Sequence, residues 1–291
     1  MAELEPGIAA AQPGPRTPAP LGRRACPVTL SEPVGRYRMI GLEDRGGPTP
    51  LPGQFYMLAC ADGWGSDLGG ERPYLPRAFS VCRVRGARLD FLIDVVGPGT
   101  ERLASMALGE RAWALGPLGI GFTAPDGVES SAPGARALLV GGGIGIAPLV
   151  IWNEALAGNV SNVALGFRDE EFAAAASLLG ANVSLATDDG SVGHAGLVTD
   201  LLSEQLERNS DRNSDRNSAV VVYACGPPAM LDAIRRICTE RGVPAQLALE
   251  QAMACGYGAC FGCVVRTRDG YRRLCVDGPI VAASDLHEEW Q

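Results

Sequence analysis

The sequence lacks an apolar run close to the roughly 20 residues that a membrane-spanning helix needs, so we expect no such helix. With a net charge of −8 it also lacks the basic excess that binding to nucleic-acid phosphates selects, which argues against a nucleic-acid partner. Histidine is scarce: His194 and His287 lie outside every motif described below, and we interpret both as ordinary surface residues.

Secretory features are also missing. The first residues have no apolar signal region, and the nine cysteines are an odd number, so we expect a cytoplasmic protein rather than a disulfide-bonded one. We interpret five scattered cysteines as small core residues: Cys26, Cys60, Cys82, Cys225 and Cys238. Residues 1–25, rich in Ala, Pro and Gly, are predicted to form a disordered extension.

Four cysteines near the C-terminus have a spacing that indicates a metal centre. Cys255, Cys260, Cys263 and Cys275 form a C-x4-C-x2-C-x11-C pattern, whose start matches plant-type [2Fe–2S] loops. Gly256, Gly258 and Gly262 would let the backbone turn sharply around such a cluster. A structural zinc site is the alternative, but zinc sites typically pair two short knuckles, and only one C-x2-C occurs here. The spacing therefore favours the cluster.

The region 26–124 has short apolar segments separated by turn residues, which predicts an antiparallel β-barrel. We expect strands at 27–30, 37–42, 54–59, 78–84 and 89–96, and a helix near 100–108. The polar stretch 66–71 is predicted to be a surface loop. Gly116-Pro-Leu-Gly119 is interpreted as a turn that closes the barrel.

Two short motifs in this region suit a flavin nucleotide. Arg77-Ala78-Phe79-Ser80 offers a cation for a pyrophosphate together with an aromatic ring and a hydroxyl group. Gly97-Pro-Gly99-Thr100 enters the expected helix, whose free N–H groups favour a phosphate. Each motif alone is weak, because an ordinary strand and an ordinary helix cap explain them equally well.

The region 133–246 changes to a pattern typical of a parallel α/β sheet, with strands expected at 137–140, 163–166, 182–186 and 219–225. The first strand leads into a glycine-rich turn and a helix, a combination that cradles nucleotide phosphates, although it is not the G-x-G-x-x-G fingerprint. The candidate residues of this turn are Gly141, Gly142, Gly143 and Gly145. At the end of the last strand, Cys225 and Gly226 are predicted to lie where a nicotinamide ring meets a flavin, with Cys225 a candidate catalytic residue or simply a buried one.

Acidic residues near strand ends slightly favour NAD over NADP, because a carboxylate can accept a hydrogen bond from a ribose hydroxyl group. These residues are Asp169, Glu170, Asp188 and Asp189. The segment 208–218 contains the repeat Asp-Arg-Asn-Ser and is interpreted as a low-complexity surface insertion. The remaining residues, 247–291, are predicted to form a small cluster domain.

With these motifs in order, the chain resembles the ferredoxin-reductase superfamily, and within it the electron-transfer subunits of the NAD-linked, heteromeric class of dihydroorotate dehydrogenase. The resemblance covers about 26–291, and its most specific part is the cysteine loop with only eleven residues before Cys275. Ala78 and Phe79 depart from the Pro-Ile often found in these subunits, and the N-terminal tail and the repeat are additions.

The resemblance implies that FAD lies between the barrel and the α/β domain. Its implied contacts are Arg77, Ala78, Phe79, Ser80, Leu92, Ile93, Asp94, Gly99 and Thr100. It also implies an FMN-containing partner that oxidises dihydroorotate, in a heterotetramer with two copies of each subunit. Electrons would pass through the [2Fe–2S] cluster and FAD to NAD, in pyrimidine biosynthesis.

Redox chemistry gives this order a reason of its own, because NAD accepts a hydride, a [2Fe–2S] cluster passes single electrons, and a flavin can do both. Two other functions stay open. One is a ferredoxin- or sulfide-linked NAD(P) oxidoreductase subunit, and the other is a non-enzymatic regulatory subunit that binds a nucleotide and zinc.

Overall fold

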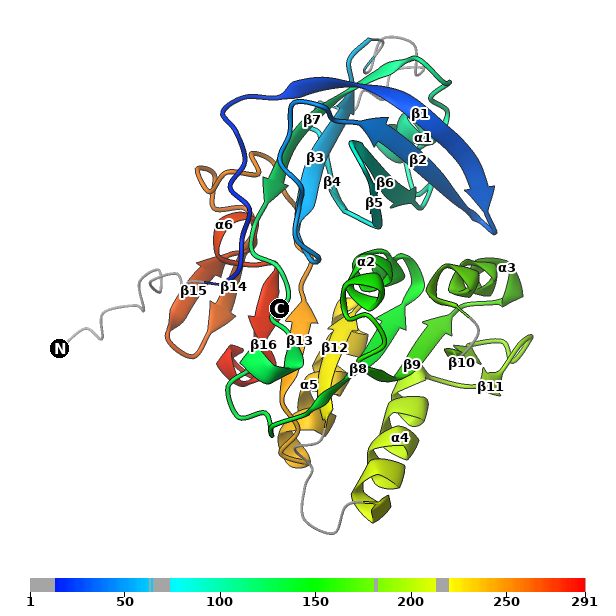
Figure 1. Ribbon diagram of the computed structural model, residues 1–291, viewed down its shortest axis with the longest axis vertical. Helices are drawn as coiled ribbons and strands as arrows, with labels where there is room; N and C mark the ends of the chain where they lie inside the picture. The colour runs from blue at the N-terminus through cyan, green and yellow to red at the C-terminus, as the bar shows by residue number, and fades with distance from the viewer. Residues whose placement is uncertain (1–13, 63, 65–73, 181–182, 213–219, 291) are drawn as a thin grey trace, which may run out of the picture.

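The structure, a computed structural model, describes residues 14–62, 64, 74–180, 183–212 and 220–290. The chain forms a curled antiparallel sheet, a parallel α/β layer beside it, and a C-terminal segment that packs against both (Figure 1). None of the described helices is long and apolar enough to cross a membrane. The loop predicted at 66–71 and most of the predicted repeat insertion lie outside the described residues.

The first sheet has seven antiparallel strands in the order β4-β3-β7-β1-β2-β6-β5. The strands are β1 (Arg24–Val34), β2 (Tyr37–Glu43), β3 (Phe55–Cys60), β4 (Arg77–Ser80), β5 (Arg83–Arg85), β6 (Arg88–Ile93) and β7 (Arg111–Leu118). The two edge strands, β4 and β5, are separated in the chain by only Val81 and Cys82, so the edges must come close and the sheet curls. The predicted barrel is therefore confirmed, although one expected strand is divided into β4 and β5.

Two local predictions in the barrel need correction. The segment 116–118, interpreted from the sequence as part of a turn, belongs to β7, where it pairs with β3 across a register shift. The helix expected near 100–108 begins earlier, as α1 (Pro98–Ala104). In both cases a proline next to glycine suggested a break, but tertiary pairing or an N-terminal proline allowed regular structure.

The second sheet has the order β11-β10-β9-β8-β12-β13-β16, and only its last pair is antiparallel. Its strands are β8 (Arg136–Gly142), β9 (Val160–Phe167), β10 (Val183–Thr187), β11 (His194–Ala195), β12 (Val220–Cys225), β13 (Ala245–Ala248) and β16 (Ile280–Ala282). Its helices are α2 (Ala147–Ala155), α3 (Glu170–Ala173), α4 (Val198–Arg212) and α5 (Pro228–Glu240). This arrangement confirms the predicted parallel α/β layer.

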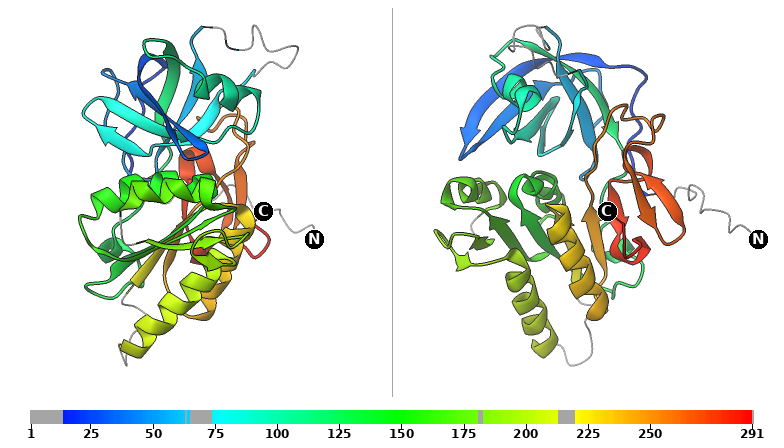
Figure 2. Two further views of the ribbon diagram at one scale, coloured as in Figure 1. Left: turned by 90° about the vertical axis from the view of Figure 1, so that its right-hand side faces the viewer. Right: turned by 180° about the vertical axis from the view of Figure 1, so that it is seen from behind.

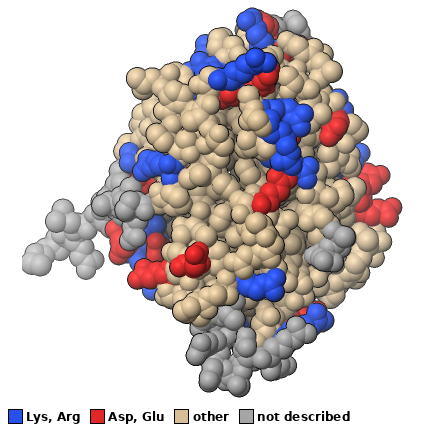
Figure 3. All heavy atoms as spheres, in the orientation of Figure 1, with Lys and Arg blue, Asp and Glu red and all other residues tan. Residues whose placement is uncertain are grey.

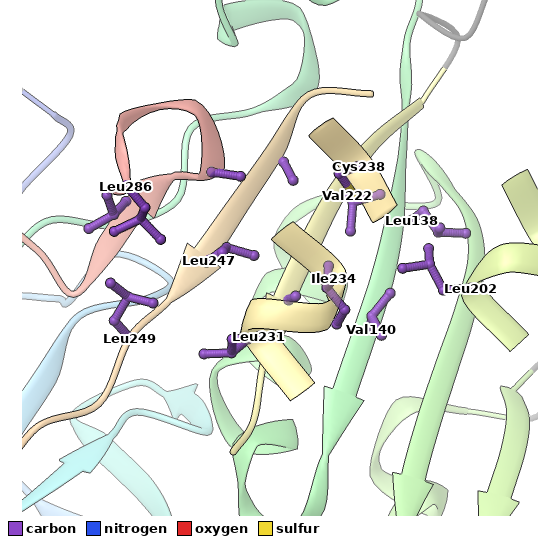
Figure 4. Close-up of a cluster of buried hydrophobic side chains, with 14 of the residues drawn as sticks. Leu138, Val140, Leu202, Val222, Leu231, Ile234, Cys238, Leu247, Leu249 and Leu286 are labelled. Carbon is purple, nitrogen blue, oxygen red and sulfur yellow. The ribbon is translucent and has the colours of Figure 1, made fainter. Parts of the chain in front are cut away.

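Alternation along β8 explains the two layers of helices. Leu138 and Val140 pack in one core with residues of α4 and α5, whereas Ala137 and Leu139 pack in the other core with α2. Figure 4 shows the first of these cores, with Leu138 and Val140 facing Leu202 of α4 and Ile234 of α5. A strand buried on both faces is continuously apolar, which is the pattern seen in the sequence.

The C-terminal segment is joined to the α/β layer. It contains the hairpin β14 (Val264–Thr267) and β15 (Gly270–Arg273), followed by α6 (Leu274–Asp277) and β16. Figure 2 shows this segment, coloured orange to red, beside the barrel and the edge of the second sheet. The boundary expected after residue 246 falls inside β13, and β16 pairs with β13, so the sheet itself continues into the expected cluster domain.

Part of the N-terminal extension is ordered, contrary to the expectation for residues 1–25. The carbonyl group of Pro15 accepts a hydrogen bond from the Gly121 N–H (2.7 Å). Thr17 makes two backbone hydrogen bonds, of 3.2 and 3.0 Å, to the side chain of Gln54, which is fully buried. Residues 14–23 therefore lie across the segment that connects the two sheets. The buried amide group of Gln54 needs hydrogen-bond partners, and Thr17 supplies two of them.

Ion pairs also join the barrel to the α/β layer. Glu154 of α2 accepts hydrogen bonds from Arg83 (2.9 Å) and Arg85 (2.7 Å) of β5. Figure 3 shows basic and acidic side chains side by side on the face that spans the two layers. These pairs are partly exposed, so each contributes about 1 kcal/mol or less, but they fix the orientation of the surfaces that form the cavities below.

Candidate cofactor sites

A cavity of about 270 Å³ lies at the carboxyl end of β8, where the α/β layer faces the barrel. Four of the predicted nucleotide-binding residues line it: Gly142, Gly143, Gly145 and Gly226. The fifth glycine, Gly141, does not, because it is buried between Leu165, Ile146 and Leu149. Ligands of open α/β sheets bind at this position, outside the carboxyl ends of the strands.

Close packing explains why Gly145 has no side chain. A Cβ atom at this position would lie 2.6 Å from the carbonyl oxygen of Cys225 and 2.6 Å from the amide nitrogen of Gly226. The turn after β8 and the end of β12 thus meet backbone to backbone. This contact brings the two predicted nicotinamide-binding loops together at one cavity.

Cys225 itself lies behind the cavity wall. It is 1% exposed and packs with Val221 and Tyr223 in the core that faces α2. Burial raises the pKa of its thiol well above the usual value, so the thiol stays neutral. Gly226 and Pro227 line the cavity in its place, and the catalytic role of Cys225 stays a prediction.

A second cavity, of about 250 Å³, opens between the barrel and α2. Six of the predicted FAD contacts line it: Ala78, Phe79, Ser80, Leu92, Asp94 and Thr100. Ile93 does not, since its side chain is fully buried in the barrel core, as the alternation of β6 requires. The lining of the cavity is mostly apolar, with the hydroxyl-bearing residues Ser80 and Thr100 among its polar members.

Arg77 and Gly99 meet at the edge of this second cavity without lining it. A Cβ atom at Gly99 would lie 2.9 Å from Nε of Arg77, so the guanidinium group packs against the first turn of α1. The hydroxyl group of Thr100 is hydrogen-bonded within the loop, to Val96, Gly97 and the Gly97 carbonyl. A cation beside the N-terminus of α1 suits a pyrophosphate group.

The two cavities share a wall. Asp94, Ile144 and Glu250 line both of them, and these residues come from the barrel, the glycine-rich turn and the segment after β13. Glu250 is exposed to the cavities, and the protein around it raises the pKa of its carboxyl group through desolvation. Ligands bound in the two cavities would therefore be immediate neighbours beside these three residues.

Sequence reasoning missed several cavity residues. In the first cavity these include Tyr37 of β2, Phe172 of α3 and Arg168, whose Cζ atom lies 4.5 Å from the Phe172 ring centroid. In the second they include Phe55 and Met253. Arg168 was detectable, because it directly follows β9. The others come from barrel strands, the short helix α3 and a loop, and carry no local signal.

Two of the four acidic residues expected near strand ends have other partners. Asp169 caps α3 by accepting a hydrogen bond from the Phe172 N–H (3.2 Å), and Asp189 accepts one from the Ser191 N–H (2.9 Å). Asp169, Glu170, Asp188 and Asp189 are all absent from the lining of the two described cavities. The preference for NAD therefore stays a prediction.

The four loop cysteines form two pairs. The side chain of Cys260 lowers the pKa of Cys255, and the side chain of Cys275 lowers the pKa of Cys263. The first pair is near the surface, with Cys260 exposed, whereas Cys263 and Cys275 are 3% and 2% exposed. The loop thus has an outer and an inner pair of thiols.

Local hydrogen bonds favour thiolates at one member of each pair. Burial raises the pKa of Cys255, but N–H groups of Cys260, Tyr257 and Ala259 outweigh it and bring the pKa to about 7. The hydrogen bond from Cys275 lowers the pKa of Cys263 to about 6. The same bond raises the pKa of Cys275. Thiolates are the form that binds iron.

The four thiols supply the number of ligands that a two-iron cluster needs, two for each iron. Among the described residues, no group of three or more Cys, His, Asp or Glu side chains is arranged to hold a metal ion.

Only two of the three predicted loop glycines need to be glycine. Gly256 (φ +76°) and Gly258 (φ +83°) have left-handed backbones, and a Cβ atom on either would lie 2.7 Å from a neighbouring side chain. At Gly262 the nearest atom would be 3.6 Å away, an ordinary contact. Instead, Phe261 adopts the left-handed conformation (φ 59°), which the sequence did not suggest.

The curled sheet, the α/β layer and the two adjoining cavities define a protein of the ferredoxin-reductase class. A solved NADH-dependent reduced ferredoxin-NADP oxidoreductase has the same fold, with a TM-score of 0.69 at 23% identity, covering 93% of this chain and 91% of the other. A ferredoxin NADP⁺ reductase from Neisseria gonorrhoeae, solved with FAD and NADP, has a TM-score of 0.58 at 18% identity, covering 79% of this chain and 93% of the other.

Sequence comparison identifies the family. Residues 250–287 match the iron–sulfur cluster binding domain of dihydroorotate dehydrogenase B. The electron transfer subunit of dihydroorotate dehydrogenase B (NAD(+)) from Shouchella clausii is 39% identical over 81% of this chain and 86% of the relative. The one from Caldanaerobacter subterraneus subsp. tengcongensis is 34% identical over 82% and 88%. The chain belongs to the family of electron transfer subunits of dihydroorotate dehydrogenase B.

Proposed function

We propose that this chain transfers electrons from a dihydroorotate-oxidising, FMN-containing partner through a [2Fe–2S] cluster and FAD to NAD⁺, in the de novo synthesis of pyrimidines. The observation that carries the proposal is the family membership, over four fifths of the chain, together with four paired thiols next to two adjoining cavities. The chain acts as an oxidoreductase subunit, and dihydroorotate is oxidised on the partner.

The second cavity is assigned to FAD and the first to NAD. FAD supplies the exchange between single electrons and a hydride. The side chains of Ala78, Phe79 and Ser80 would orient the flavin, and Gly142, Gly143 and Gly145 would hold the dinucleotide phosphates. Asp94, Ile144 and Glu250, in the shared wall, would keep both rings in one water-poor contact, because hydride transfer depends on orientation and the exclusion of water.

The cluster ligands are assigned to Cys255, Cys260, Cys263 and Cys275. The outer pair is the proposed side of electron entry, since the exposed side chains Tyr257 (66%) and Phe261 (46%) lie next to Cys260 and offer a partner an apolar contact. On the inner side, Cys263 and Cys275 belong to the same core as Phe55, which lines the FAD cavity. Met253, two residues before Cys255, also lines that cavity.

This assignment associates each part of the chain with one cofactor, while residues of the neighbouring parts also line both cavities. We assign FAD to the barrel, residues 26–124, NAD to residues 133–246 and the cluster to residues 247–291. The partner would form a heterotetramer with two copies of each subunit. We place the assembly in the cytoplasm, where the scattered buried thiols, such as Cys60 and Cys238, stay reduced.

Dihydroorotate-dependent reduction of NAD⁺ tests the proposal. We expect no activity with the purified chain alone and activity when the FMN-containing subunit is added. NADH should bleach the flavin and cluster absorbance of this chain. A protein whose cofactors bleach with NADH but that stays inactive in the mixture would point instead to the alternative ferredoxin or sulfide donors. A colourless, zinc-containing protein would contradict the redox function.

A further inference from the structure

Two charged residues flank Cys275 and face the cluster loop. Arg273 is the last residue of β15, and Asp277 is the last residue of α6. Oδ2 of Asp277 accepts hydrogen bonds from both Nε and the backbone N–H of Arg273, each of 3.2 Å. The side chain of Asp277 is 1% exposed and that of Arg273 is 27% exposed, so the carboxylate is inside the protein while the guanidinium group is partly open to solvent.

Arg273 also reaches the outer half of the cluster loop, the part that contains Cys255 and Cys260. Its Nη1 atom donates a hydrogen bond to the Gly258 carbonyl oxygen (3.4 Å), and its Cζ atom lies 5.7 Å from the Phe261 ring centroid. The backbone of Gly258 also packs against α6, since a Cβ atom on this glycine would lie 2.7 Å from Cγ2 of Val276. Gly258 of the outer half is thus held by Arg273 at its carbonyl oxygen and lies against the helix that carries Cys275.

The charges of the Arg273–Asp277 pair also have a direction relative to the loop. The cation faces the loop, while the second carboxylate oxygen, Oδ1 of Asp277, is buried without a hydrogen-bond partner among the described residues. A buried carboxylate is tolerated only with a partner, and Arg273 donates two hydrogen bonds to it. Removing either member would therefore loosen the loop and leave the other charge uncompensated.

We propose that Arg273 and Asp277 are positioning residues that hold the outer half of the cluster loop on the inner half and set the reduction potential of the cluster by their opposite charges. The inference rests on the proposed [2Fe–2S] site. Four thiolates make such a cluster anionic, so the Arg273 cation favours an added electron and the Asp277 carboxylate disfavours it.

Three variants and one control test this proposal on the full-length chain with its cofactors. Arg273→Gln and Asp277→Asn each remove one charge, and Arg273→Lys keeps the charge but loses the planar fork. Arg266→Gln is the matched control, because Arg266 carries the same charge on the same hairpin but is paired with Glu289, 3.5 Å away. Iron content per chain, FAD absorbance, and the midpoint potential of the cluster in a spectroelectrochemical titration are measured.

We expect Arg273→Gln to shift the potential to more negative values and Asp277→Asn to shift it to more positive values, with both variants losing iron faster than Arg266→Gln. Arg273→Lys should keep a potential close to that of the unmodified chain. A structural role alone would weaken cluster retention in both variants without shifts of opposite sign.

Shifts of the same sign, or shifts no larger than that of Arg266→Gln, would overturn the inference. If Arg273→Gln binds FAD but retains no cluster, the positioning role is supported, and Asp277→Asn against the control still decides the effect of charge. Failure of the inference and failure of the proposed function are distinguishable: an unmodified chain that binds no iron–sulfur cluster contradicts both, whereas unchanged potentials in cluster-containing variants contradict only the inference.

Discussion

The glycine-rich turn at 141–145 and the cluster loop at 255–263 look alike in the sequence but need glycine for different reasons. In the turn, Gly145 is required by space, because a side chain would collide with the backbone of β12. In the loop, Gly256 and Gly258 are required by their left-handed backbones as well as by their neighbours. The comparison shows that a glycine-rich motif predicts a tight backbone without revealing which constraint produces it.

The two segments also differ in what surrounds them. The turn lies between β8 and α2, in the centre of the α/β layer, so a defect there should affect both stability and ligand binding. The outer half of the cluster loop is exposed at Cys260, so a defect there should affect the cluster more than the fold. The predictions below separate these two effects.

The largest effect is expected from Cys275→Ser. The inner pair would lose one of its two thiols, and we expect the cluster to be lost completely while FAD remains bound. The measurement is iron content together with the visible spectrum. Cys238→Ser is the matched control, because Cys238 is equally buried in the same core but outside the loop. Cluster loss in the control as well would show that general destabilisation, not ligand removal, is responsible.

Gly145→Ala should produce the next largest effect. Its methyl group would displace the end of β12, and overpacking of this kind typically costs about 1–3 kcal/mol of stability. We expect a lower thermal midpoint and an affinity for NAD⁺ reduced about 10-fold or more, measured by calorimetric titration. The cluster content should stay unchanged, in contrast to the loop variants. An NAD⁺ affinity equal to that of the unmodified chain would contradict the proposed contact.

Gly258→Ala and Gly262→Ala form a matched pair within the loop. The first variant must hold a left-handed alanine, at a cost of about 1–2 kcal/mol, and must also displace Val276. The second has room for a methyl group. We therefore expect faster cluster loss in air for Gly258→Ala than for Gly262→Ala, followed by the decay of visible absorbance; equal decay rates would mean that the loop relaxes freely.

The smallest effect is expected at Phe261, whose φ of 59° is unfavourable for a residue with a side chain. Phe261→Gly and Phe261→Ala both remove the ring, so their difference isolates the backbone. We expect the glycine variant to be more stable than the alanine variant by about 0.5–1 kcal/mol, in thermal or denaturant unfolding. A more stable alanine variant would contradict the assigned backbone conformation.

Local patterns predicted the parts of the molecule that depend on neighbours in the chain. The apolar strand before Gly141, the glycine-rich turn and the cysteine spacing each point to one structure, and the family resemblance placed them in order. The conformations of Gly116–Leu118 and of residues 14–23 were not predictable in this way. The first is decided by pairing with β3 and the second by hydrogen bonds to the buried Gln54, 37 residues further along the chain.

The sequence by itself determined the fold class, the four thiols and all four glycines that line the two described cavities, because spacing and periodicity are local properties. Only the tertiary structure decided that Cys225 is buried behind the cavity, that Asp94 and Glu250 share a wall, and that Arg273 reaches Gly258. These contacts join residues from different strands and loops. Their positions follow from how the two sheets and the C-terminal segment pack. No single stretch of the sequence predicts that packing.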